Sequence, residues 1–226
     1  MDGVITSPVQ PYRPLYEDAY SALRDAILNG RLKPGIRIVE AEIARQMGIS
    51  RAPVREAIRK LEQDGLVRYV PRRGAVVVKL SLDEVRDVYY LRAHLEAYAA
   101  RLAAARVTDE DLAALKTLID QMTECANRDD MQGLIAADVA FHARICRISG
   151  SKRLPVLWDS LNPHSWTLLT SHKSTRFTPR EIAERHHSIL DALRARDADR
   201  AESTMRSHIT ILADEVLTRL DKEVND

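Results

Sequence analysis

Residues 15–79 carry the pattern that most constrains the fold, because three short helices are predicted there in quick succession. Apolar residues recur at helical spacing over residues 15–28, 40–47 and 50–64. Glycines just beyond these segments end the helices, and Ser50 stands where it can cap the third one. The order is therefore one helix followed by a helix–turn–helix.

Two short apolar runs follow, over residues 66–70 and 75–79, and Pro71-Arg72-Arg73-Gly74 lies between them. Short apolar runs joined by a glycine-containing turn predict a β-hairpin. A helix, a helix–turn–helix and a hairpin in this order form a winged helix–turn–helix.

The pattern changes after residue 80 to long helices with no strand signal. Capping boxes or other N-terminal signals and periodic apolar residues predict helices over residues 81–105, 108–128, 131–148, 154–172 (with a break at Pro163), 178–196 and 197–220. The expected fold is mainly α, with an N-terminal winged helix–turn–helix followed by an all-α helical bundle. We expect a flexible, proline-containing arm over residues 1–14, a DNA-binding domain over 15–79, and a helical domain over 80–226.

The charge distribution differs between the two parts. The whole chain has a net charge of +1, but residues 1–80 hold 14 basic and 9 acidic residues, against 20 and 24 in residues 81–226. A basic first part suggests contact with a polyanion, although chance could also produce this split. No apolar run is long enough to cross a membrane, no signal peptide is evident, and Cys125 and Cys146 form no disulfide framework. These observations favour a cytoplasmic protein without membrane association.

The start of the third helix holds the candidate DNA-reading residues. Ser50, Arg51 and Arg55 lie where a helix–turn–helix presents its second helix to the major groove, and the two arginines share one helical face. Arginine pairs bidentately with guanine and also suits phosphate. Arg73 and Gly74 lie at the predicted hairpin tip, where a wing can contact DNA. The alternative is an ordinary solvated basic face.

Residues 49–57 (ISRAPVREA) and 61–67 (LEQDGLV) resemble the DNA-binding domain of GntR-family bacterial transcriptional regulators. The resemblance covers about residues 12–79 and implies operator contacts by Arg51, Arg55, Arg73 and Gly74. Many relatives carry arginine or threonine where this chain has Ala41, so this position is not expected to contact a base.

A second group of residues is typical of a metal site. Asp138 and His142 are four residues apart on a predicted helix and share its apolar face, while His186 and His208 lie on apolar faces of two later helices. One carboxylate and three imidazoles in a bundle could bind Zn²⁺, Ni²⁺ or Mn²⁺. The simpler interpretation is that of core histidines hydrogen-bonded to Asp138.

The C-terminal part resembles the ligand-binding FCD domain of the FadR subgroup, through residues 138–142, 184–190 and 205–209. The resemblance implies that Asp138, His142, His186 and His208 hold a divalent metal beside a small carboxylic-acid effector, and that Arg92 clamps this acid. His187 is the alternative to His186, and an ion pair with Glu96 on the surface is the alternative role of Arg92.

We therefore expect a homodimeric transcriptional regulator that binds double-stranded operator DNA and senses a small organic acid through a metal. One alternative is a metal-dependent hydrolase with a DNA-binding tether, but the sequence shows no further inward carboxylate to act as a general base. A second alternative is a regulator whose metal is purely structural. We do not expect an enzyme.

Overall fold

The computed structural model describes residues 14–79, 81–161, 167 and 177–225, with side chains up to residue 222. The chain divides after Lys79 into two compact units. The predicted arm before Pro14 and the predicted helix break at Pro163 lie outside the described residues. No helix in the described part of the chain is long and apolar enough to cross a membrane.

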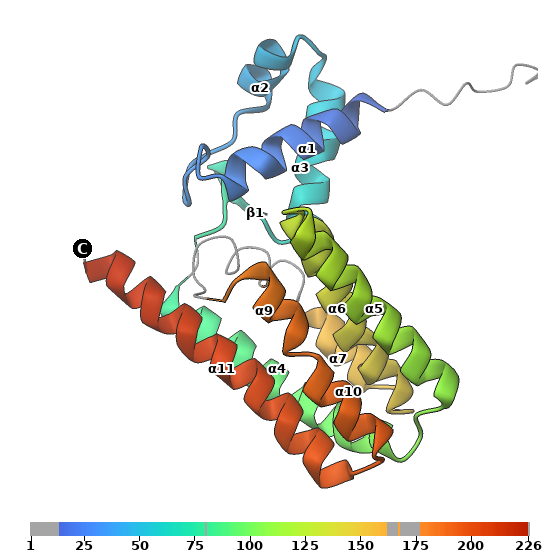
Figure 1. The fold of residues 1–226 in the computed structure, drawn as a ribbon. Helices are drawn as coiled ribbons and strands as arrows, with labels where there is room; N and C mark the ends of the chain where they lie inside the picture. Colours follow the sequence, from blue (N-terminus) through green and yellow to red (C-terminus); the bar gives the residue numbers. More distant parts are fainter. Residues whose placement is uncertain (1–13, 80, 162–166, 168–176, 226) are drawn as a thin grey trace, which may run out of the picture. The chain divides into compact units, whose positions relative to one another are not determined.

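The first unit is a winged helix–turn–helix, as predicted (Figure 1). Its helices bury one apolar stripe each, and the largest contributions come from Leu23, Ile27, Val54, Ile58 and Leu61. Its elements are α1 (Leu15–Leu28), α2 (Glu40–Met47), α3 (Arg51–Gln63), β1 (Val67–Val70) and β2 (Gly74–Val77).

The hairpin differs in detail from the sequence prediction. β1 and β2 pair antiparallel, with Val70 opposite Gly74, so the connecting turn is Pro71–Arg73. The segment before α2 adds a short third strand-like stretch, in which the Ile38 amide donates to the Ala75 carbonyl at 2.8 Å and Arg37 pairs with Val76. Ser50 occupies the N-cap position of α3, but its side chain makes no capping hydrogen bond.

The second unit is an all-α bundle (Figure 1). Its two longest helices, α4 and α11, lie side by side and run antiparallel, since Tyr90 contacts Asp214 and Arg101 contacts Glu202. Helices α5 and α6 pack together as a second pair. The helices are α4 (Leu82–Ala104), α5 (Asp109–Asn127), α6 (Met131–Ile148), α7 (Leu154–Ser160), α9 (Pro179–Glu184), α10 (His187–Arg194) and α11 (Ala198–Asn225).

Three of the helix starts that the sequence predicts are set by capping boxes. The side chains of Ser81, Thr108 and Thr178 each accept a hydrogen bond from the backbone three residues on, and the acidic side chain at that position bonds back. The prediction of helix starts at these positions is confirmed.

The single helix predicted over residues 178–196 is wrong, because the chain turns at Arg185 and His186 between α9 and α10. The His186 ring explains the break: its Nδ1 lies 2.9 Å from the Ile182 carbonyl, which the backbone amide of residue 186 would bind in a continuous helix. That amide bonds to Ala183 instead, at 3.2 Å. The Ser188 hydroxyl donates to the Arg185 carbonyl at 3.0 Å.

One hydrogen bond joins the first helix of the winged unit to the end of α3. The Tyr20 hydroxyl donates to Asp64 Oδ2 at 2.6 Å, and burial together with this contact raises the pKa of Tyr20 to about 12. We expect Tyr20→Phe to cost about 1.5–3 kcal/mol, which is the usual contribution of a hydrogen bond to a charged acceptor. Amide hydrogen exchange in α1 and α3 should become at least about tenfold faster. Tyr16→Phe is the matched control, since its hydroxyl contacts Glu17 only at 3.4 Å. Equal exchange in both variants would contradict the assignment.

Candidate functional site

The candidate DNA-reading residues lie on an exposed face at the start of α3. Ser50, Arg51 and Arg55 are all exposed, whereas Val54 and Ile58 on the opposite face are buried. Arg55 is held by Glu40 of α2: its Nε lies 3.1 and 3.2 Å from the two carboxylate oxygens, and its Nη2 donates at 2.9 Å. A guanidinium has a second donor edge, formed by Nη1 and Nη2. Within the described part of the chain, no contact occupies this second edge of Arg55.

The wing residues lie at the tip of the hairpin. The turn is closed by the Arg73 amide, which donates to the Val70 carbonyl at 3.0 Å, and the Arg73 side chain is exposed. Gly74 has a φ of +80°, a conformation that glycine adopts without steric cost. A Cβ at this position would come no closer than 3.8 Å to Arg37, so the backbone angle rather than space favours glycine.

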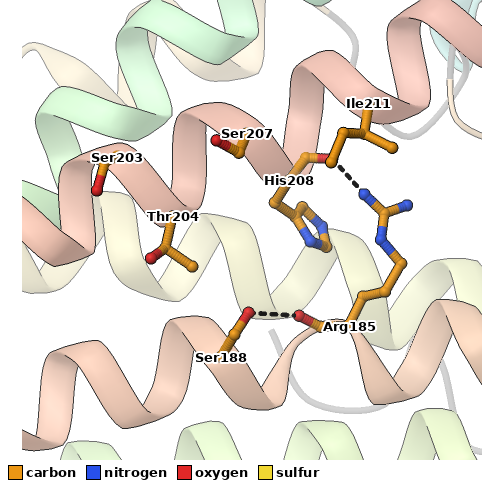
Figure 2. Close-up of a pocket in the computed structure, with 7 residues that line it drawn as sticks. All are labelled: Arg185, Ser188, Ser203, Thr204, Ser207, His208 and Ile211. Carbon is orange, nitrogen blue, oxygen red and sulfur yellow. Dashed lines mark hydrogen bonds between the residues drawn. The ribbon is translucent and has the colours of Figure 1, made fainter.

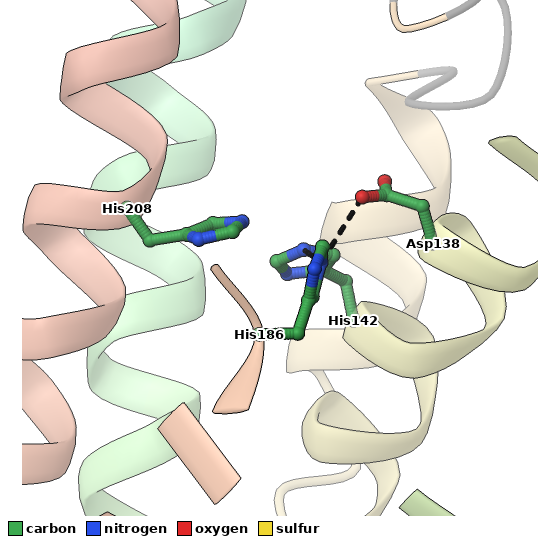
Figure 3. Close-up of side chains that lie close together, drawn as sticks. All are labelled: Asp138, His142, His186 and His208. Carbon is green, nitrogen blue, oxygen red and sulfur yellow. Dashed lines mark hydrogen bonds and ion pairs between the residues drawn. The ribbon is translucent and has the colours of Figure 1, made fainter. Parts of the chain in front are cut away.

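The four predicted metal ligands lie together inside the helical unit (Figure 3). One ligand atom from each comes within 4.8 Å of all the others, and all four residues are buried. The Nε2 atoms of His142 and His186 are 3.3 Å apart, and Asp138 Oδ1 lies 3.1 Å from the same His186 nitrogen. Ligands held about 2.1 Å from one ion are themselves about 3 Å apart, so these distances fit a shared ion. The group comprises Asp138 and His142 of α6, His186 between α9 and α10, and His208 of α11.

The contacts of Nδ1 in His186 and His142 determine which ring atoms face the centre of the cluster. The His186 Nδ1 donates to the Ile182 carbonyl, and the His142 Nδ1 lies 2.5 Å from Glu96 Oε2. Because a carbonyl and a carboxylate only accept, Nδ1 is the nitrogen that carries the proton when either ring is neutral, and Nε2 then presents its lone pair to the centre. The two Nε2 atoms and the Asp138 carboxylate oxygen therefore face one another. A cation between them satisfies all three.

The charges of the cluster also favour a cation. Burial raises the pKa of the Asp138 carboxyl, but without a metal the hydrogen bond from a protonated His186 and the positive charges of His142, His186 and Arg92 outweigh this effect and lower it to about 2. Burial lowers the pKa of His208 well below its ordinary value, and positive charge on His186 and His142 would lower it further. The cluster thus contains an ionised carboxylate and a neutral His208, which are the protonation states that bind metals.

Glu96 of α4 is a functional residue that the sequence analysis missed. Its side chain is 1 % exposed, and its Oε1 accepts from Arg92 Nε at 2.8 Å and from Trp158 Nε1 at 2.7 Å, while Oε2 faces His142. Burial raises its pKa, but the charges of Arg92 and His142 outweigh burial, and the pKa falls below its usual range. The prediction that no further inward carboxylate lies near the cluster is therefore wrong.

Arg92 is also buried, at 1 % exposure, so its pairing with Glu96 is not the surface ion pair considered above. Its Nη1 donates to Thr167 Oγ1 at 3.1 Å. Two of its three nitrogens are therefore engaged by the protein, and its role toward an acid stays a prediction. His187 is exposed and lies outside the cluster, so His186 is the histidine that joins it.

Comparisons with known proteins agree with both halves of this description. The family described as "Bacterial regulatory proteins, gntR family" matches residues 15–77, and the FCD domain family matches residues 87–210. The HTH-type transcriptional repressor RspR of Escherichia coli K12 is 28 % identical over 94 % of this chain and 93 % of its own length. A regulator in the TAR-I ttuE-ttuC' intergenic region of Agrobacterium vitis is 42 % identical over 55 % of this chain and 74 % of its own length.

Solved structures of similar fold are regulators as well. Escherichia coli McbR/YncC superposes with a TM-score of 0.61 at 26 % identity, over 89 % of this chain and 98 % of that one. A GntR regulator from Rhodococcus sp. RHA1 gives a TM-score of 0.66 at 25 % identity, over 91 % and 99 %. These families contain transcriptional regulators rather than enzymes, which argues against the hydrolase alternative. With a winged helix–turn–helix followed by an FCD domain, the chain belongs to the GntR family of bacterial transcriptional regulators.

Proposed function

We propose that this regulator binds operator DNA as a homodimer and senses a small organic acid through a divalent metal held by Asp138, His142, His186 and His208. One observation carries the metal part of this proposal. In a buried site, His186 Nε2 lies 3.3 Å from His142 Nε2 and 3.1 Å from Asp138 Oδ1, and Nδ1 of each histidine faces an acceptor of its own. Such an arrangement is unfavourable without a cation among them.

The donor set narrows the identity of the ion. Three imidazoles and one carboxylate suit Zn²⁺, Ni²⁺ or Mn²⁺ better than the oxygen-loving Mg²⁺ or Ca²⁺. When bound, the ion supplies a Lewis-acidic contact for a carboxylate. Glu96 contacts the His142 nitrogen that points away from the cluster, and the Ile182 carbonyl contacts the corresponding nitrogen of His186. Contacts of this kind commonly orient histidines that bind a metal.

The buried charges explain why the sensed molecule is an acid. Asp138 and Glu96 contribute two negative charges and Arg92 one positive charge, and all three side chains are buried. A divalent ion brings their sum to +1, so one carboxylate neutralises the site. In this proposal Arg92 contributes positive charge to the acid site while it remains bonded to Glu96.

The origin of the ligands suggests how binding is transmitted. The ligands come from α6, from the break between α9 and α10, and from α11. A molecule that contacts the ion therefore binds more tightly to one arrangement of these helices than to another. This difference in affinity shifts the population toward the arrangement that binds more tightly. Dimerisation follows from the paired half-sites that helix–turn–helix proteins read.

The DNA part of the proposal predicts two different effects of arginine removal. Arg51→Ala and Arg55→Ala should each weaken specific binding by about 1–3 kcal/mol, because each arginine would read a guanine. Arg73→Ala should weaken binding evenly across sequences, because a phosphate contact carries no base information. Affinities for a duplex selected from a randomised library measure both effects. Arg128→Ala, which removes an exposed arginine of the helical unit, is the control. Unchanged affinity in both α3 variants would contradict the assignment.

The metal part predicts that metal and acid are lost together. A chelator should remove about one metal per chain and abolish acid binding, and His208→Ala should do the same, because ligand loss removes the ion. Arg92→Ala should keep the metal and weaken the acid, whereas His187→Ala should change neither. Elemental analysis and thermal-shift titration with carboxylic acids measure these quantities. A metal-free protein purified without chelators would count against the site, and full acid binding after chelation would make the metal purely structural.

Glu96 provides a separate test of how the cluster is held. Glu96→Gln should lower metal affinity about 10–100-fold, because a neutral amide orients His142 less firmly than a carboxylate does. A competition titration with a chromogenic chelator measures this affinity. Glu84→Gln, at the exposed start of the same helix, serves as the control. Equal metal affinity in the two variants would show that Glu96 does not support the site.

A further inference from the structure

A polar groove runs between the α9–α10 break and α11 (Figure 2). It has a volume of about 350 Å³. Four of its seven lining residues carry hydroxyl groups, one is a cation, one is apolar and one is a histidine. The lining residues are Arg185, Ser188, Ser203, Thr204, Ser207, His208 and Ile211.

Arg185 brings a positive charge to this groove. Its Nη2 donates to the His208 backbone carbonyl at 2.8 Å, and its guanidinium lies 4.4 Å from the centre of the Phe177 ring. No carboxylate of the described residues lies within ion-pair distance of it. An anion in the groove would pair with this guanidinium.

The hydroxyl groups of the groove fall into two pairs. Ser188 donates to the Arg185 carbonyl at the α9–α10 break at 3.0 Å, and Ser203 donates to the Arg200 carbonyl of its own helix at 3.1 Å. Thr204 and Ser207 are three residues apart on one face of α11, and their hydroxyls donate to no acceptor among the described residues. These two hydroxyls are available to a ligand.

The groove also reaches the metal cluster. His208 is 8 % exposed, whereas His142 and His186 are at most 1 % exposed. In Figure 2 the His208 ring lies between Thr204 and Arg185. His208 therefore belongs to the cluster and also forms part of the groove wall.

We propose that this groove is the acid-binding site: a small hydroxylated carboxylic acid places its carboxylate against Arg185 and its hydroxyl groups against Thr204 and Ser207, beside His208. The inference deepens the proposed acid-sensing function and rests on it. It adds Arg185 to the groups that contact the carboxylate, because no carboxylate among the described residues forms an ion pair with this guanidinium, whereas Arg92 is paired with Glu96.

The lining of the groove determines the class of ligand. A volume near the lower end of the usual range for ligand sites favours a small molecule. Ile211 is the single apolar side chain in the lining, so the groove offers little to an aliphatic acid. One cation and two available hydroxyls match one carboxylate with hydroxyl substituents.

Three small probes separate these contributions. Glycerate and propionate share a three-carbon chain and a carboxylate, and glycerol has the hydroxyls without the carboxylate. Isothermal titration calorimetry on the metal-loaded full chain should find glycerate binding about tenfold more tightly than propionate, because two more hydrogen bonds form. Glycerol should show no measurable binding.

Variants of the groove test the individual residues. Arg185→Met should weaken glycerate about 10–100-fold, because a charge-assisted contact is lost. The double variant Thr204→Val with Ser207→Ala should remove the advantage of glycerate over propionate and leave propionate unchanged. Arg180→Met is the matched charge control, because it removes an exposed arginine of α9. Thr218→Val is the hydroxyl control farther along α11. Metal content is measured for each variant, so that a change in the cluster is not mistaken for a change in the groove.

The outcomes distinguish this inference from the proposed function. If glycerate binding requires metal but is unaffected by the groove variants at full metal content, the groove is overturned and metal-dependent sensing stands. If chelated protein binds glycerate with the same dependence on Arg185, the groove is supported and the metal coupling fails. Equal binding of glycerate and propionate, or no binding of either to the metal-loaded chain, overturns the ligand class.

Discussion

The helical unit depends on one buried carboxylate, that of Glu96. Removing an ionised carboxylate from water costs several kcal/mol unless donors replace the water. Here the donors come from three different helices: Arg92 lies on the same helix, Trp158 on α7 and His142 on α6. The positions of α6 and α7 against α4 are therefore constrained by the geometry of one charged group, in addition to the apolar packing around it.

The histidine cluster is built on this constraint. Glu96 determines which nitrogen of His142 carries the proton, and so which nitrogen faces Asp138 and His186. The residues that meet in the cluster are far apart in the sequence, from Asp138 to His208. An ion bound there links α6, the α9–α10 break and α11, so metal affinity and the packing of the bundle are thermodynamically coupled. The α9–α10 break and α11 also line the acid site proposed above.

Local signals in the sequence predict much of this structure. The i, i+4 spacing of Asp138 and His142 places both on the buried face of α6, and the capping boxes at Ser81 and Thr108 mark real helix starts. Contacts between distant segments were not predictable in this way. The i, i+4 spacing of Arg92 and Glu96 is compatible with an ion pair on an exposed face and with one on a buried face. Only the fold, in which Trp158 packs over Glu96, shows that the pair is buried. Glu40 and Arg55 pair across fifteen residues, through the fold of the winged unit.

The break between α9 and α10 limits the substitutions that position 186 can accept. The His186 ring uses one nitrogen to replace a backbone amide as the partner of the Ile182 carbonyl, and it directs the other nitrogen toward the cluster. Cysteine or aspartate could replace a metal ligand in chemical terms, but neither carries a second, oppositely directed donor. Either replacement would leave the Ile182 carbonyl without its partner and remove the cause of the turn. His186 is therefore the ligand with the fewest acceptable replacements, because a single side chain both shapes the backbone and faces the site.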